Sequence, residues 1–230
     1  MRAVSFDVWG TLLDLRVARE AVIEAISRAS GVPAEKVRSA VAEADREVRR
    51  LRRTRGLGGS ESVRLSLDIV ARGIGYAGDL LHVANEAVAS LRPEAVVLGD
   101  APAAIRYVSS AGLKVGVLGN TLFWSSSATK ILLEKAFGNV FSFVGFADEI
   151  GFSKPDPRAF ELAASSMDVD VSELAHVGDR ASEDMGGALA VGAKAILVAR
   201  GKVKEVFAFP ELGFAVIPDL SHLGDVLKKL

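Results

Sequence analysis

The sequence predicts an α/β fold: a Rossmann-like parallel sheet core with a second, α-helical unit inserted after the first strand. Short apolar stretches alternate with helical stretches through most of the chain, a pattern typical of a parallel sheet with helices on both faces. Residues 15–91 break this alternation, because little in them resembles a strand. A chain of 230 residues is long enough for one core domain that carries a smaller insertion.

Six apolar stretches are expected to form the strands. Four of them end near a polar or glycine-marked turn, as buried strands commonly do. These four are AVSFDV (3–8), KVGVLGN (114–120), FSFVGFAD (141–148) and LAHVGD (174–179), and the two others are KAILVA (194–199) and FAVIP (214–218). Helical stretches at 101–112, 157–167 and 182–192 lie between the later strands, which favours a parallel sheet.

Residues 15–91 are expected to form a helical cap. Apolar residues recur at helical spacing from Val37 to Leu51, while several arginines fall on another face of the same helix. The segments GLGGSES and RGIGYAGD predict breaks between helices. We therefore divide the chain into an α/β core of residues 1–14 and 92–230 and a helical cap of residues 15–91.

Composition excludes several classes of function. The formal net charge of −1 gives no general reason to expect nucleic acid or an acidic membrane surface as a partner. Cysteine is absent, so disulfides and thiolate sites are excluded. No apolar run approaches the ~18–20 residues of a membrane helix, and none near the N-terminus resembles a signal peptide. We expect a cytoplasmic protein with no nucleic-acid or membrane partner. Arginine outnumbers lysine and glutamine is absent, which favours a thermophilic source. The oligomeric state is left open.

The chemistry is predicted at the carboxyl ends of the strands, where open parallel sheets bind ligands. The polar residues expected at this edge are Asp7, Asn120, Thr121, Lys154, Asp179 and Asp184. Carboxylates that converge without histidine or cysteine suit a hard cation such as Mg²⁺. An aspartate can also act as a covalent nucleophile, and a lysine can hold it in place and pair with substrate charge.

Four segments resemble the motifs of the haloacid dehalogenase (HAD)-like hydrolase superfamily. In chain order they are FDVWGTL, VGVLGN, SKPDP and VGDRASED, and the helical insertion falls between the first two, as in the capped subfamily I. The resemblance covers essentially the whole chain and is phosphatase-like. It implies an enzyme that hydrolyses a small phosphorylated metabolite, with Mg²⁺ as cofactor and an aspartyl-phosphate intermediate.

The resemblance also implies a role for each motif residue. Asp7 would be the nucleophile, and Lys154 would orient both Asp7 and the substrate. Asp179 would ligate Mg²⁺ together with Asp7 and the backbone carbonyl of Trp9, which any side chain at that position can supply. Asp184 would support the metal shell directly or through water. Backbone amides near Gly10 and Asn120 would neutralise charge that develops on the phosphoryl group.

Two positions depart from the phosphatase pattern. Trp9 stands where these phosphatases carry a second aspartate that protonates the leaving alkoxide, and its indole cannot act as that acid and base. Losing such a group costs about 10²–10⁴-fold in rate. Gly119 stands where the second motif usually ends in a serine or threonine, so Thr121 becomes a candidate source of that hydroxyl.

These departures leave three alternatives open. An aromatic residue at position 9 is the pattern of 2-haloacid dehalogenases, whose leaving halide needs no proton, although their fourth motif differs from GDRASED. A branch that cleaves carbon–phosphorus bonds also lacks the second aspartate but needs a cap lysine, and only Lys36 lies in residues 15–91. The non-enzymatic alternative is a member that binds metal and a phosphorylated ligand and turns over poorly.

The segment REVRRLRRTR (46–55) carries six arginines. Its simplest interpretation is a solvated helix face, and the functional one is that the cap offers an arginine to an anionic substrate. We take Arg53, with Arg55 as its neighbour, as that candidate, and place it with Trp9, Gly10, Asn120 and Thr121 among the substrate-binding residues. His176 lies within an expected strand and is interpreted as a buried core histidine.

Overall fold

A computed structural model describes residues 1–230 except for the side chains of Arg53 and Arg55. Its centre is a seven-stranded sheet in the order β3-β2-β1-β4-β5-β7-β6. The strands are β1 (Ala3–Phe6), β2 (Lys114–Gly119), β3 (Phe143–Phe146), β4 (Leu174–Gly178), β5 (Lys194–Val198), β6 (Phe207–Phe209) and β7 (Phe214–Ile217). All six predicted strands form and pair in parallel, which confirms the predicted fold class.

The prediction missed β6, a three-residue strand that pairs antiparallel with β7 at the edge of the sheet. Phe207 and Phe209 remain 46% and 43% exposed, so the segment has no buried apolar run to mark it as a strand.

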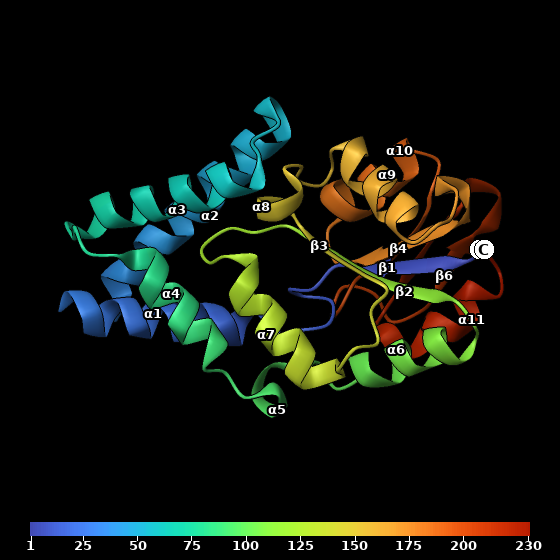
Figure 1. The fold of residues 1–230 in the computed structure, drawn as a ribbon, viewed down its shortest axis with the longest axis horizontal. Coiled ribbons are helices and arrows are strands. Elements are labelled where there is room, and N and C mark those ends of the chain that lie inside the picture. The colour runs from blue at the N-terminus through green and yellow to red at the C-terminus, as the bar shows by residue number, and fades with distance from the viewer.

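Helices cover both faces of the sheet (Figure 1). On one side lie α9 (Pro157–Ser166) and α10 (Gly186–Ala190), and on the other α6 (Ala101–Ser110) and α11 (Leu223–Leu227). The remaining elements near the core are α5 (Pro93–Val96), α7 (Ser126–Phe137) and α8 (Ala147–Ile150), with the single turns η1 (Val171–Glu173), η2 (Ala181–Met185), η3 (Pro210–Leu212) and η4 (Leu220–His222). η2 is a π-helix.

Between β1 and β2 the chain first forms four helices that gather beyond one end of the sheet (Figure 1). They are α1 (Leu15–Ser30), α2 (Ala34–Arg55), α3 (Gly59–Ile74) and α4 (Leu80–Ala89). The Asp14 side chain accepts a hydrogen bond from Arg16 N and so caps α1, and Asp79 caps α4 in the same way through His82 N. The predicted apolar stripe of α2 is buried from Val37 to Val48.

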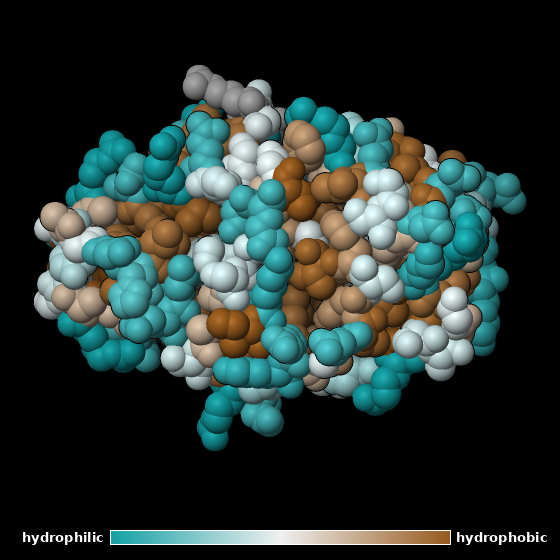
Figure 2. All heavy atoms as spheres, viewed as in Figure 1, coloured by the Kyte–Doolittle hydropathy of each residue, from teal (hydrophilic) through white to brown (hydrophobic). Residues whose placement is uncertain are grey.

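One hydrophobic cluster joins the helical unit to the sheet. It contains Phe6 of β1, Ile23 of α1 and Val70 of α3, all at most 1% exposed. A second cluster around Phe160 and Leu174 fills the opposite face of the sheet. On the side seen in Figure 2, hydrophilic residues occupy much of the outer rim and hydrophobic ones show between them. None of the described helices combines the length and the apolar character that a membrane span requires.

Candidate active site

Asp7 lies at the carboxyl end of β1, where its backbone N–H donates to Val177 O of β4 at 2.8 Å. Three successive amides, from Thr11 to Leu13, then donate to Val8 O and close a tight turn. Gly10 occupies this turn with a φ of +102°, and a Cβ there would lie 2.6 Å from Oδ2 of Asp179. The turn therefore requires glycine, and this close approach lets it pack against the carboxylate at the end of β4.

Lys154 reaches the nucleophile candidate from the loop before α9 and is 1% exposed. Its Nζ lies 2.8 Å from Oδ1 of Asp7 and 2.7 Å from Oδ1 of Asp184, and it donates to Leu118 O at 2.6 Å. Burial lowers the pKa of Lys154, but the two carboxylates outweigh it and hold that pKa above its ordinary value. Burial likewise raises the pKa of Asp184, but the ammonium outweighs it and holds the pKa well below its usual range.

Asp7, Asp179 and Asp184 form the cluster that the strand ends predict. One oxygen of each lies within 4.8 Å of the others. Burial and the two neighbouring carboxylates raise the pKa of Asp7 from 3.8 to about 7, although Lys154 opposes them. Burial also raises the pKa of Asp179, and its Oδ1 is buried with no partner among the described residues. An all-oxygen donor set with an unpartnered buried oxygen fits a hard divalent cation.

His176 is buried, as predicted, and it also contacts the charged residues of the site. Its Nε2 lies 3.2 Å from Oδ1 of Asp184 and 3.3 Å from Nζ of Lys154, while its Nδ1 lies 2.8 Å from Oγ of Ser5. Burial lowers the pKa of His176 to about 4, so the ring is neutral near pH 7. The position of His176 in β4, three residues before Asp179, is the feature of the sequence that places it near the site. The apolar residues around it indicate a core position and give no sign of the contact with Lys154.

Asn120 and Thr121 follow β2, and both line the cavity. The Asn120 amide is held by the main chain of Lys154: Nδ2 donates to Lys154 O at 2.9 Å, and Oδ1 accepts from Lys154 N at 2.8 Å. Thr121 O accepts from Nη2 of Arg52 at 2.7 Å, and its Oγ1 is buried without a hydrogen-bond partner among the described side chains. At Gly119 a Cβ would lie 2.6 Å from the ring of Phe146, so that ring fills the place of the usual hydroxyl.

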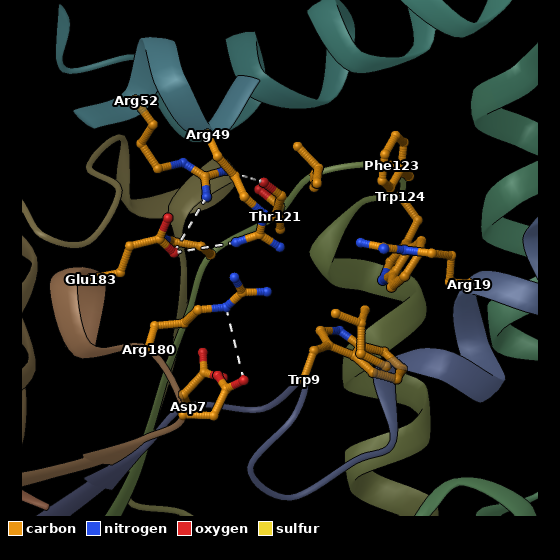
Figure 3. A pocket seen from close by; sticks show the side chains of 14 residues that line it. Asp7, Trp9, Arg19, Arg49, Arg52, Thr121, Phe123, Trp124, Arg180 and Glu183 are labelled. Carbon is orange, nitrogen blue, oxygen red and sulfur yellow. Dashed lines mark hydrogen bonds and ion pairs between the residues drawn. The ribbon is translucent and has the colours of Figure 1, made fainter. Parts of the chain in front are cut away.

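The Trp9 indole turns toward α7. Its Nε1 donates to Oγ1 of Thr129 at 3.3 Å, the same oxygen that accepts from Nε1 of Trp124 at 3.1 Å. The two indole rings meet edge to face with centroids 5.2 Å apart. With Phe123 they form an aromatic wall of the cavity that Asp7 also lines (Figure 3).

Arginines from the helical unit and from the core reach the same cavity, whose volume is about 50 Å³. Figure 3 shows Arg19, Arg49, Arg52 and Arg180 around it. The side chain of Arg53, the predicted substrate contact, lies outside the described residues. Arg49 and Arg52, which do reach the cavity, were not among the predicted site residues.

Two signals for these arginines were present in the sequence. Arg52 stands four residues after Val48, so it continues the apolar stripe of α2 and is buried with it. Asp45 precedes Arg49 by one helical turn and accepts from its Nε at 2.6 Å. Asp45 also lies 3.2 Å from Nη2 of Arg19, so one carboxylate orients two of the arginines.

Comparison with known proteins adds a family and a set of relatives. The family model of the haloacid dehalogenase-like hydrolases matches residues 1–192. Haloacid dehalogenase-like hydrolase domain-containing protein 3 of Bos taurus is 34% identical over 139 residues, which are 58% of this chain and 53% of that protein. The glyceraldehyde 3-phosphate phosphatase of Methanothermobacter thermautotrophicus is 31% identical over 123 residues, 52% of this chain and 54% of that protein. The chain thus spans about half the length of these curated relatives.

Solved structures share the fold over nearly the whole chain. YfnB of Bacillus subtilis, solved with bound magnesium, superposes with a TM-score of 0.77 at 16% identity and covers 99% of this chain and 98% of that one. The L-2-haloacid dehalogenase of Xanthobacter autotrophicus superposes with a TM-score of 0.71 at 21% identity, with 99% and 98% covered. At these identities the likeness concerns the fold, and the choice between reactions depends on the site.

Proposed function

Since the chain belongs to the haloacid dehalogenase-like hydrolases, we propose that it is a Mg²⁺-dependent phosphatase of a small phosphorylated metabolite. The observation that carries the proposal is the cluster of Asp7, Asp179 and Asp184 around Lys154. The acidic pair of Asp179 and Asp184 beside the nucleophile suits a cation, whereas a halide displacement needs none. The similarity to the glyceraldehyde 3-phosphate phosphatase of Methanothermobacter thermautotrophicus supports the same substrate class.

In this proposal Asp7, Asp179 and the carbonyl of Trp9 would hold Mg²⁺. Both oxygens of Asp184 already have protein donors, since Oδ1 meets Lys154 and Oδ2 accepts from Arg180 N at 2.8 Å. We therefore expect Asp184 to act on the metal through water. When bound, the cation supplies positive charge beside the phosphoryl oxygens and lowers the pKa of Asp7.

The reaction begins at the carboxylate of Asp7. One Asp7 oxygen attacks phosphorus, the bond from phosphorus to the ester oxygen breaks, and an aspartyl phosphate forms. Lys154 holds Asp7 in place and faces the developing negative charge. Water then attacks the same phosphorus, the bond to Asp7 breaks, and inorganic phosphate leaves. The helices of residues 15–91 would act as the cap that excludes bulk water during these steps.

Because residue 9 is not an acid, the leaving alkoxide must take its proton from water. The Trp9 indole is a donor with no basic lone pair, and its N–H is directed at Thr129. A phosphate ester with an acidic alcohol, such as an aryl phosphate, needs this proton least. We therefore propose that the rate depends strongly on the pKa of the leaving alcohol.

The experiment that tests the function compares two reactions on the same preparation. Release of phosphate from an aryl phosphate is measured with and without Mg²⁺, and release of chloride from a 2-chloro acid is measured beside it. Metal-dependent phosphate release that is lost in Asp7→Asn supports the proposal, and metal-independent chloride release overturns it. If neither is turned over while Mg²⁺ still binds, the chain is a ligand-binding member of the family. Lys36 is exposed in the first turn of α2, away from the cavity, which weighs against carbon–phosphorus cleavage.

A further inference from the structure

Glu183 places a carboxylate among the arginines of the cavity, although it belongs to the core and stands next to Asp184. Its Oε2 lies 3.7 Å from Nη1 of Arg49 and 3.7 Å from Nη1 of Arg52, both on α2. The same oxygen accepts from Nδ2 of Asn120 at 3.3 Å. Figure 3 shows the carboxylate of Glu183 directed toward these two arginines. We propose that Glu183 is a specificity-determining residue that restricts the site to phosphate esters whose organic part carries no negative charge.

The local backbone explains why Glu183 faces inward. Successive residues of an α-helix point about 100° apart, so adjacent residues rarely share one buried site. Glu183 and Asp184 lie in the π-helix η2, and they are only 4% and 2% exposed. This wide turn lets both carboxylates point inward, with Asp184 directed toward Lys154 and Glu183 toward the arginines of the cavity. Because the two residues are adjacent in this turn, a backbone movement that turned Glu183 away from the arginines would also displace Asp184.

The charges of the site balance only when Glu183 is included. The described cations that line the cavity or directly back it are Arg19, Arg49, Arg52, Arg180 and Lys154. The described carboxylates in the same positions are Asp7, Asp45, Asp179, Glu183 and Asp184. When a bound cation keeps all of these carboxylates ionised, the described protein groups are neutral in sum. Among the described residues, a Mg²⁺ ion then matches one phosphate ester dianion, and no further cation is left for a second anionic group.

A substrate carboxylate would therefore meet Glu183 as a like charge in a buried site. This repulsion disfavours the binding of a competing ester that carries a second negative charge. An alcohol or aldehyde on the organic part meets no such repulsion. Either group can accept from the arginines, and an alcohol can also donate to Glu183. This inference rests on the proposed phosphatase reaction and adds the charge class of its substrate.

The test uses two esters with the same carbon skeleton and the same kind of leaving group, glycerol 3-phosphate and 3-phosphoglycerate. Both lose a primary alcohol, so the missing acid at Trp9 affects them equally. We expect the wild type to prefer glycerol 3-phosphate at least about tenfold in kcat/KM, and Glu183→Gln to reduce that preference at least about tenfold. Glu205→Gln, which removes the same charge from an exposed position, is the matched control and should keep the wild-type ratio.

Two further measurements cover the cases in which turnover is slow or absent. Each ester is also measured as a competitive inhibitor of aryl phosphate hydrolysis, so that binding is compared even where aliphatic turnover is slow. If no phosphate ester is hydrolysed, the proposed function fails, and the shift in Tm that each ester causes with Mg²⁺ still tests the role of Glu183. A wild type that favours 3-phosphoglycerate, or a ratio unchanged in a folded Glu183→Gln, overturns the inference. If Glu183→Gln does not fold, Glu183→Asp is measured in its place. This variant keeps the negative charge, so it must keep the preference for glycerol 3-phosphate.

Discussion

Nε1 of Trp9 donates to Oγ1 of Thr129, 120 residues further along the chain, at 3.3 Å. This bond directs the indole toward α7 and Trp124 and so away from the carboxylate of Asp7. The side chain at position 9 therefore belongs to the wall of the site, while its backbone stays in the turn that presents the nucleophile. The relationship separates the structural role of Trp9 from the proton transfer that an aspartate would perform there.

Trp9→Asp should restore an acid at that position. We expect the rate of hydrolysis of aliphatic phosphates to rise about tenfold or more relative to aryl phosphates, because an alkoxide needs a proton at the leaving oxygen more than a phenolate does. The measurement is kcat for both esters at saturating Mg²⁺. Trp9→Phe removes the indole N–H without adding an acid and serves as control. Equal effects of Trp9→Asp on the two esters would count against this account.

Asp7→Asn should stabilise the metal-free protein at alkaline pH. The pKa of the Asp7 carboxyl is 3.8 ordinarily and about 7 in the folded chain. At a pH between these two values, the folded state therefore holds a proton on Asp7 that the unfolded state has lost. The stability that this proton contributes is complete below pH 3.8 and is lost as the pH rises through about 7.

We therefore expect the variant to exceed the wild type by about 2 kcal/mol at about pH 8, and the advantage to vanish near pH 4. Urea denaturation of both proteins across this range, in the presence of a chelator, measures the difference. Comparing the two proteins cancels the titration of His176, whose lowered pKa acts with the opposite sign. A difference that does not change with pH would show that Asp7 titrates normally.

Lys154→Met should destabilise the chain and abolish turnover. It leaves the buried carboxylates of Asp7 and Asp184 without their shared ammonium, and breaking such a buried pair costs about 3 kcal/mol or more. Acid protonates the two carboxylates, so the loss should be smaller at about pH 5 than at about pH 8 in urea denaturation. Lys130→Met removes a half-exposed partner of Glu149 and should cost well under ~1 kcal/mol. Equal losses for the two variants would contradict the bridging role of Lys154.

Gly119→Ser should be destabilising even though serine is the family's usual residue there. The new Cβ would lie 2.6 Å from the Phe146 ring, and overpacking of this kind costs about 1–3 kcal/mol. Combining it with Phe146→Leu should recover much of the loss, because the smaller side chain frees the space. Gly99→Ser adds the same side chain in open space and is the control. The measurement is the midpoint of thermal or urea unfolding, and additive effects of the two substitutions would refute the contact.

The six predicted strands and the insertion after the first were readable from the sequence because buried parallel strands are apolar runs of characteristic length. The polar residues at the ends of these runs, Asp7 and Asp179 above all, were identified for the same reason. Once parallel strands are aligned, their carboxyl ends share one edge of the sheet. Strand β6 was missed because its phenylalanines stay half-exposed and carry no buried pattern.

What the tertiary structure decided is the direction of side chains and their distant partners. His176 meets Lys154, Trp9 meets Thr129, Phe146 fills the space at Gly119, and Glu183 meets two arginines of α2. Each pair joins residues from different elements, so periodicity along one segment cannot reveal it. Packing of the helical unit against the sheet brings Arg49 and Arg52 over the cavity, and burial then requires that each charge have a partner. The sequence by itself determined which residues stand at the sheet edge, and the packed structure determined what each of them touches.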